Sequence, residues 1–212
     1  MAPVSDPDLL VLHGLRLKSF APAEVVAEIA GLPVDAVISR LEGFRDKEWA
    51  RYREGVLTGW MLTAAGRAEG ERLLADEVDG LGARAEIEAA YRRFLLLNQA
   101  LLQVCTDWQL RPVEGMDEPV MNDHSDEGYD QDVVAALRSL DAEVQPICDD
   151  LASIVDRFGG YSSRLTAALD KIAAGDPDWF TKPTIDSYHT VWFELHENLL
   201  ATLGIERGKE DT

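Results

Sequence analysis

The chain has 212 residues, of which 46% are hydrophobic, and its mean hydropathy is -0.14, so it has enough apolar sequence for a buried core and is not wholly disordered. No apolar stretch approaches the roughly 20 residues needed to cross a bilayer, and no basic segment precedes an apolar run near Met1. We therefore expect no secretory signal, no membrane partner and a cytoplasmic location. The two cysteines, Cys105 and Cys148, fit reduced thiols better than a disulfide framework and exclude a zinc ribbon.

The chain is strongly acidic, with 20 Lys and Arg against 39 Asp and Glu and a formal net charge of -19. Such a charge disfavours broad electrostatic capture of nucleic acid or anionic lipid, because both ligands require a basic surface. The net charge is -5 over residues 1–80 and -14 over residues 81–212. Any contact with DNA must therefore be local, and the acid is concentrated in the second part.

A change of pattern near residues 79–82, Asp-Gly-Leu-Gly, divides the chain. A helical pattern ends there on two glycines, which commonly terminate helices. We therefore predict two domains, 1–80 and 81–212, in a mainly α protein.

The first domain is predicted to contain four helices and a two-stranded ribbon, with the period of the pattern changing from 3.6 to 2 and back. In chain order these elements are helices over 9–20, 22–30 and 33–47, a strand over 49–53, a turn at Glu54-Gly55, a strand over 56–62 and a helix over 64–77.

This order is the plan of a winged helix-turn-helix. The segment from Glu24 to Leu74, with its run Leu62-Thr63-Ala64-Ala65-Gly66-Arg67, resembles the DNA-binding domain of MarR-type winged-helix regulators. The resemblance implies a winged fold, binding to an operator and a basic wing tip at the minor groove. Winged helices also serve as protein-interaction modules, so the fold alone does not establish DNA binding.

The predicted recognition helix, Pro33 to Lys47, enters the major groove in such a module. Its predicted apolar stripe is Val34, Val37, Ile38, Leu41 and Phe44. The candidate contacts to bases or phosphates on the helix and the wing are Ser39, Arg40, Arg45, Lys47, Arg51 and Arg53. Residues 40–53 carry a net charge of +2 within an acidic domain. One such domain would bind weakly, so we expect a homodimer on a two-fold operator.

The second domain is predicted to be an all-α helical bundle. Its expected elements are a helix over 83–109, an aperiodic loop over 110–128, a helical heptad seam over 133–158, a helix over 162–174 and a last helix over 183–203. Pro146 lies inside the seam and is expected to kink the helix or split it near Gln145.

The last helix places His189 and His196 within its apolar stripe. Either both are core histidines satisfied by their neighbours, or they help to line a polar pocket for a small-molecule effector. The candidate ligand-binding residues are Asn98, Trp108, His124, Asp186, Tyr188, His189, Trp192 and His196. A metal held by Asp186, His189 and His124 is a third interpretation, whereas His189 and His196, seven residues and about 10 Å apart along the axis, cannot share one ion.

No nucleophile elbow, Walker loop, dinucleotide fingerprint or H-E-x-x-H motif is present in the sequence. We therefore expect no enzyme and no cofactor. The leading hypothesis is a dimeric transcriptional regulator, in which the first domain binds an operator and the second domain dimerises and senses a ligand. The alternative is a non-enzymatic module in which the winged helix and the acidic bundle dock on a protein partner.

Overall fold

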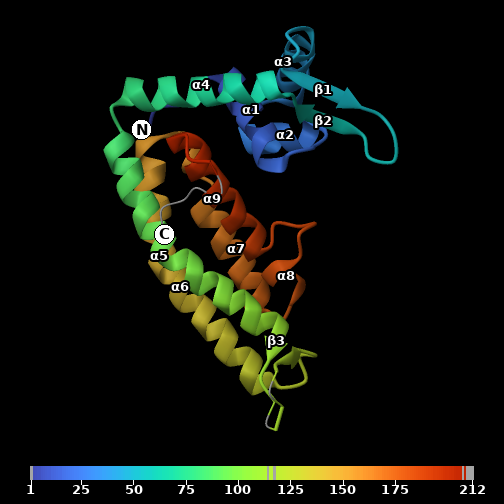
Figure 1. The fold of residues 1–212 in the computed structure, drawn as a ribbon, viewed down its shortest axis with the longest axis vertical. Helices are drawn as coiled ribbons and strands as arrows, with labels where there is room; N and C mark the ends of the chain where they lie inside the picture. The colour runs from blue at the N-terminus through green and yellow to red at the C-terminus, as the bar shows by residue number, and fades with distance from the viewer. Residues whose placement is uncertain (1, 114, 117, 207, 209–212) are drawn as a thin grey trace. The chain divides into compact units, whose positions relative to one another are not determined.

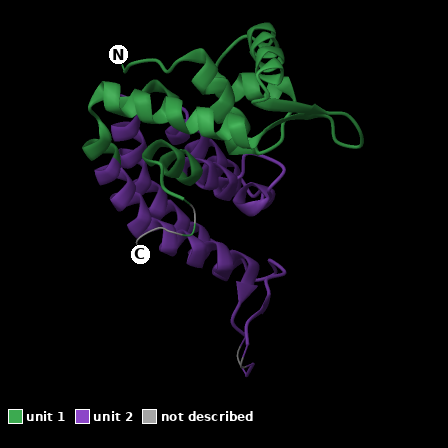
Figure 2. Ribbon diagram, turned by 45° about the horizontal axis from the view of Figure 1, so that its top comes forward, with its two compact units in different colours: residues 1–87, 154–157, 196–212 green, residues 88–153, 158–195 purple. Residues whose placement is uncertain are grey.

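The computed structural model describes residues 2–113, 115, 116, 118–206 and 208. The chain forms two compact units (Figure 2). Unit 1 consists of Met1–Ile87, Ile154–Arg157 and His196–Thr212, and unit 2 consists of Glu88–Ser153 and Phe158–Leu195. The sequence places its boundary near residue 80, whereas the units divide inside three helices, near the start of the helix 84–109, at the last residue of the helix 127–154 and in the middle of the helix 188–203. Residues from the end of the chain therefore belong with unit 1.

The fold is mainly α, as predicted, with a small antiparallel two-stranded sheet (Figure 1). None of the helices in the described part of the chain is long and apolar enough to cross a membrane. The elements of unit 1 are α1 (Pro7–Lys18), α2 (Ala23–Ala30), α3 (Val34–Asp46), β1 (Ala50–Arg53), β2 (Gly59–Leu62) and α4 (Ala64–Leu81).

Local capping explains where these helices begin and end. The Asp6 carboxylate accepts from the backbone N–H of Asp8 at 2.8 Å and begins α1, and Thr63 Oγ1 accepts from Gly66 N–H at 3.0 Å and begins α4. Gly82, at φ +63°, ends α4 in the left-handed conformation. Helix α4 therefore continues past Glu77, its predicted end.

The returning strand is shorter than predicted. β2 begins at Gly59 rather than Val56, so residues 54–58 form the loop of the ribbon. The register pairs Arg51 with Met61 and Tyr52 with Trp60. Trp60 also forms a bridge with Ala21, in the segment 19–22 between α1 and α2, so backbone hydrogen bonds join the ribbon to this segment.

Two glycines of unit 1 lie where backbone segments approach each other closely. A Cβ atom on Gly59 would lie 2.8 Å from the Ala21 carbonyl oxygen, and one on Gly66 would lie 1.9 Å from the Trp49 carbonyl oxygen. Both distances are below ordinary van der Waals contact, so only glycine fits at these two positions.

The predicted stripe of α3 is correct for three residues and wrong for two. Val37, Leu41 and Phe44 are buried in the core of unit 1, whereas Val34 is 37% and Ile38 39% exposed. Each residue advances about 100° around a helix, so Ile38 lies to one side of the face formed by Val37, Leu41 and Phe44. Val34 is in line with Leu41, but it is the first residue of α3 and is less covered at that end of the helix.

Unit 1 also contains buried charged groups. Arg16 bonds Glu71 at 2.8 Å and Glu197 at 3.0 Å, and the Nε atom of Arg157 lies 2.9 Å from Glu77 Oε2. His13 is 4% exposed, and burial, with the charges of Arg157 and Arg16, holds its pKa well below the usual value. A neutral imidazole therefore lies beside two guanidinium groups.

The described part of unit 2 contains two whole helices, parts of three others and a short hairpin. Its elements are α5 (Arg84–Gln109, from residue 88), β3 (Leu110–Arg111), β4 (Val120–Met121), α6 (Glu127–Ile154, to residue 153), α7 (Tyr161–Ala173), α8 (Asp178–Thr181) and the first half of α9 (Tyr188–Leu203), with a 3-10 turn over Asp156–Phe158 at the division between units.

Three details of unit 2 differ from the sequence predictions. The segment predicted as an aperiodic loop holds the β3–β4 hairpin, and the last helix begins at Tyr188 rather than Pro183. Helix α6 is continuous through Pro146, so of the two predicted outcomes, a kink or a split, the split is wrong. The Gln145 side chain bonds both Asp141 on its own helix and Ser162 on α7. These hydrogen bonds link α6 to α7 next to the proline.

The predicted heptad seam is confirmed as a buried face of α6. Val133, Leu137, Leu140, Val144, Ile147 and Leu151 are all buried. Ile154 is half-buried where the helix ends, and Phe158 is buried just beyond it. The repeat therefore marks the side of α6 that is shielded from solvent.

Candidate functional site

Three of the six predicted DNA-binding residues already have a partner within unit 1. The Nε atom of Arg40 lies 3.1 Å from Asp8 Oδ1, and its Nη1 atom donates to the Ala36 carbonyl at 3.0 Å. Arg45 pairs with Glu42 one turn earlier on α3. The Nζ atom of Lys47 lies 4.4 Å from the centre of the Trp49 ring. Their positive charges are thus partly compensated before any ligand binds.

Arg51 and Arg53 are placed differently, on the outer face of the ribbon. Both side chains are exposed, and in the part of the chain that the structure describes neither is seen in an ion pair with an acid. Strand alternation turns Tyr52 to the other face, where its ring lies 5.0 Å from that of Trp60. The two arginines therefore lie on the same face of the ribbon.

The exposed surface around these arginines is mixed. Ser39 is exposed on α3, together with Asp35 and Asp46. Apolar side chains are exposed as well, namely Val34, Ile38 and, in the ribbon loop, Val56 at 105% and Leu57 at 70%. Sequence analysis missed all four as surface residues, although the position of Val56 and Leu57 directly after a Glu-Gly turn was a signal for the last two.

In unit 2, several predicted ligand-binding residues are partnered with one another or with other residues of the bundle. Trp192 Nε1 donates to Asn98 Oδ1 at 2.9 Å, which joins α9 to α5. The Tyr188 hydroxyl donates to Asp141 Oδ1 at 3.0 Å, which joins α9 to α6. These bonds satisfy polar groups that interrupt apolar stripes.

The other predicted residues of α9 and of the segment before it are spread out. Asp186 accepts from Arg164 Nε at 2.9 Å, and Arg164 also bonds the buried Glu194 at 2.7 Å. His189 is half-buried, and burial lowers its pKa. His196 belongs to unit 1, whereas the other seven predicted ligand-binding residues belong to unit 2.

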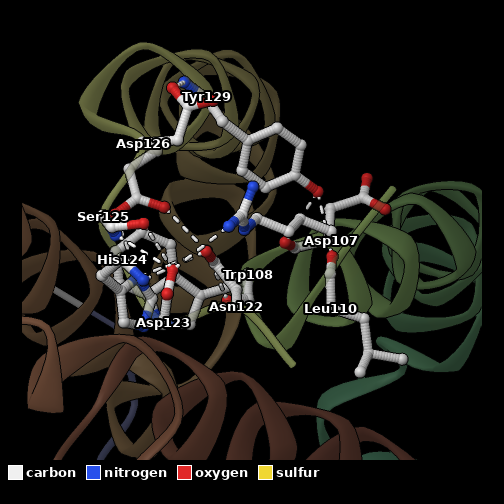
Figure 3. A network of polar contacts seen from close by, with 11 residues as sticks. Asp107, Trp108, Leu110, Asn122, Asp123, His124, Ser125, Asp126 and Tyr129 are labelled. Atoms are coloured by element: carbon white, nitrogen blue, oxygen red, sulfur yellow. Dashed lines mark hydrogen bonds and ion pairs between the residues drawn. The ribbon is translucent and has the colours of Figure 1, made fainter. Parts of the chain in front are cut away.

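A polar network at the N-terminus of α6 holds the segment around His124 (Figure 3). The Asn122 amide donates to the Trp108 carbonyl at 3.2 Å and to Asp130 Oδ1 at 2.7 Å, and His124 Nδ1 lies 2.9 Å from Asp130 Oδ2. Figure 3 also shows the Tyr129 hydroxyl directed at the Asp107 and Leu110 carbonyls. His124 has φ +58°, a left-handed conformation that this network stabilises.

Two aromatic contacts complete this region. The rings of Trp108 and Phe180 are stacked with centroids 4.3 Å apart, and the His124 ring lies 4.5 Å from Trp108. Trp108 is thus covered by a residue of α8 and by the loop histidine. The rings of His124 and Phe180 therefore already pack against Trp108 within the chain.

The structure gives no geometric support to the metal interpretation. Among the described residues, no three His, Cys, Asp or Glu side chains lie together in a group that could hold one ion. Asp186 pairs with Arg164 and His124 pairs with Asp130. Burial raises the pKa of Cys105 and of Cys148 to about 12, so both are protonated thiols at neutral pH.

Unit 1 also contains a cavity of about 360 Å³ that sequence analysis did not predict. Its lining is mainly apolar and includes three acids; the lining residues are Pro3, Val4, Asp6, Leu9, Leu73, Asp76, Glu77, Gly80 and Leu81. Asp76 pairs with Arg72 and Glu77 with Arg157, so two of these acids have partners in the chain.

Comparison with protein-family models, curated proteins and solved structures finds no match to this chain. The similarity of Glu24–Leu74 to MarR-type regulators thus stays a resemblance in the sequence pattern. A functional proposal must rest on the geometry of the residues themselves.

Proposed function

We propose that unit 1 is a winged helix-turn-helix that binds duplex DNA and that the protein is a dimeric transcriptional regulator. The order α1, α2, α3, β1, β2, α4 and the bridge between Ala21 and Trp60 support this fold. The observation that carries the proposal is the pair of exposed arginines, Arg51 and Arg53, on the face of the ribbon that follows α3.

In this arrangement α3 enters the major groove with its N-terminal half and the ribbon contacts the adjacent backbone. Arg51 and Arg53 bind phosphates, since a guanidinium group matches the geometry of phosphate oxygens. Arg40 and Arg45 contribute less, because each must give up a partner in Asp8 or Glu42. Positioning thus comes from the ribbon.

This small number of contacts predicts a shallow dependence on salt. Each neutralised phosphate contributes a slope of roughly -0.9 in log K against log salt concentration. Two arginines in one copy give a slope of about -2 and a dimer gives about -4. Useful affinity therefore requires the dimer, which sedimentation analysis of the full chain tests directly.

The test is a binding titration of the full-length protein against duplexes selected from a random library, at two salt concentrations. Replacing Arg51 and Arg53 with Glu abolishes detectable binding and leaves the folded circular dichroism spectrum intact. The matched control replaces Arg92 and Arg138, exposed arginines of unit 2, with Glu and retains binding. Equal affinities of the two double variants would refute the assignment of the ribbon.

A second candidate function is docking on a protein. The exposure of Val34 and Ile38, beside the exposed acids Asp35 and Asp46, favours it, because this side of α3 then suits a partner with apolar and basic groups. Absence of binding to any duplex at 50 mM salt by the folded dimer would favour this function over the first.

Within the regulator, we propose that unit 2 senses a small molecule. A ligand shifts operator affinity only as far as it prefers one of two arrangements of the dimer. Trp108, with His124 and Phe180 against its ring, is a natural reporter, so screening by tryptophan fluorescence tests this role. Saturable quenching that also changes DNA affinity is the expected result.

A further inference from the structure

Two aliphatic side chains are displayed on α3 next to Ser39. Val34 and Ile38 are four residues apart, so they are neighbours on the helix surface. They are 37% and 39% exposed, although Val37 and Leu41, next to them in sequence, are 0% exposed. The helix thus has apolar surface in its N-terminal half that unit 1 does not cover.

The same helix has no uncommitted cation for reading guanine. Arginine and lysine are the side chains that commonly bind guanine in the major groove. Arg40 is bound to Asp8 and to the Ala36 carbonyl, and Arg45 is bound to Glu42. Lys47 lies beyond the end of α3 and packs over Trp49. Recognition by α3 therefore draws first on its other exposed side chains, since Arg40 and Arg45 must each leave an ion pair before they bind a base.

We infer that α3 recognises thymine through the C5-methyl group, with Val34 and Ile38 as the contacting side chains. The inference rests on the proposed function and specifies the operator as a duplex with thymines in the major groove facing α3. The thymine methyl is the apolar group on the major-groove edge of a base pair. Ser39, which can bond either kind of base edge, adds a polar contact beside them.

The basic ribbon beside α3 favours DNA as the occupant of this surface, whereas the exposed acids Asp35 and Asp46 of α3 are the charges that favour a protein. β1 follows α3 directly and packs against it. Its exposed arginines, Arg51 and Arg53, supply the positive charge that a phosphate backbone requires. Burial of one methyl group against an aliphatic side chain strengthens binding by about fourfold.

The experiment compares thymine with deoxyuridine, which differs from it only by lacking the methyl group. The full-length protein first selects duplexes from a random library, and thymines of the best duplex are then replaced one at a time. Binding is expected to weaken about fourfold for each methyl that contacts Val34 or Ile38. Replacement at other positions of the same duplex leaves binding unchanged.

The variant Ile38→Ala identifies the side chain involved. Alanine suits an exposed helix position, so the variant folds. It binds the thymine duplex about fourfold or more weakly than wild type and no longer distinguishes thymine from deoxyuridine at one position. The matched control is Met61→Ala, which removes an exposed apolar side chain, 37% exposed, from the ribbon and keeps the discrimination.

The outcomes separate this inference from the function on which it rests. Tight binding to the selected duplex with no loss on deoxyuridine replacement, or full discrimination by Ile38→Ala, would overturn the thymine assignment while DNA binding stands. Failure of the wild-type protein to bind any duplex at 50 mM salt would overturn the proposed function itself, and docking on a protein would then be the better explanation of the exposed side chains.

Discussion

The candidate binding residues of the two units differ in whether the chain already provides their partners. In unit 1, Arg51 and Arg53 are exposed on the ribbon, and the aliphatic side chains of Val34 and Ile38 are exposed on α3. In unit 2, Tyr188 and Trp192 are buried and bonded to Asp141 and Asn98. The former are open to a ligand, and the latter are enclosed in the bundle.

This difference separates two kinds of residue, buried polar groups with a partner in the chain and exposed groups without one. A buried polar group that has found a partner in the same chain contributes to the architecture of the core. An exposed aliphatic side chain has no such partner, and a ligand that covers it gains free energy. The part of unit 1 that combines exposed aliphatic side chains on α3 with the exposed arginines of the ribbon is therefore our candidate for macromolecular binding.

The largest effect is expected from a change that separates the ribbon from its support in unit 1. Gly66→Ala places a Cβ atom 1.9 Å from the Trp49 carbonyl oxygen, and backbone atoms cannot move aside cheaply. The free energy of unfolding should fall by about 3 kcal/mol or more. Urea denaturation measures the loss, and hydrogen exchange should show it in peptides of β1 and β2 rather than of α6.

Gly43→Ala is the matched control for that variant. Gly43 lies inside α3, and a Cβ atom there meets nothing within 4 Å among the described residues. Alanine should stabilise unit 1 by about 0.5–1 kcal/mol, since glycine loses more backbone entropy in a helix. Equal destabilisation by the two variants would contradict the close approach at Gly66.

A smaller loss is expected from removing one hydrogen bond inside unit 2. Tyr188→Phe deletes the hydroxyl that donates to Asp141 and leaves this buried carboxylate with the amide of Gln145. The expected cost is about 2 kcal/mol, measured by urea denaturation. Tyr52→Phe, at a tyrosine that is 43% exposed, should change stability by less than about 0.5 kcal/mol. A similar cost at both sites would show that the buried bond contributes little.

The smallest effect is a pH dependence that originates in unit 1. Burial and the charges of Arg157 and Arg16 lower the pKa of His13 in the folded state, so below about pH 6.5 the unfolded chain binds a proton that the folded chain does not. The free energy of unfolding should therefore decrease as the pH is lowered below about 6.5, by up to about 1.4 kcal/mol for each pH unit.

Thermal unfolding at pH 7.5 and 5.5 measures this loss, and His13→Leu should reduce the difference between the two midpoints. His189→Leu in unit 2 provides the comparison, because burial lowers the pKa of this half-buried histidine as well and it should account for a smaller share. An unchanged pH dependence in His13→Leu would exclude His13 as its source.

Much of the secondary structure could be predicted from the sequence, because it depends on near neighbours. The proline before α3, Thr63 before α4 and the apolar repeat of α6 are local signals, and the structure has helices at all three places. The end of α4 was misplaced because Gly80 is tolerated inside a helix, whereas Gly82 adopts the left-handed conformation that ends it.

The candidate sites were less predictable, because their state depends on distant residues. Nothing in the local sequence around Arg40 indicates that Asp8 pairs with it. Arg164 likewise bonds Asp186 and Glu194, because the packing of the helices brings these three residues together. The residue types indicate where charged and polar side chains lie in the sequence. They do not indicate which of these side chains form ion pairs or hydrogen bonds in the folded chain.

Periodicity and capping within a few residues are enough to predict the mainly helical class, the ribbon after the third helix and the buried seam of α6. Three other features follow only from the folded chain: Val34 and Ile38 are exposed, Arg51 and Arg53 are exposed while Arg40 and Arg45 are paired, and the second half of α9 belongs with unit 1. The orientation of a helix and the partner of a charge are set by packing between segments far apart in the chain, and local patterns do not contain that information.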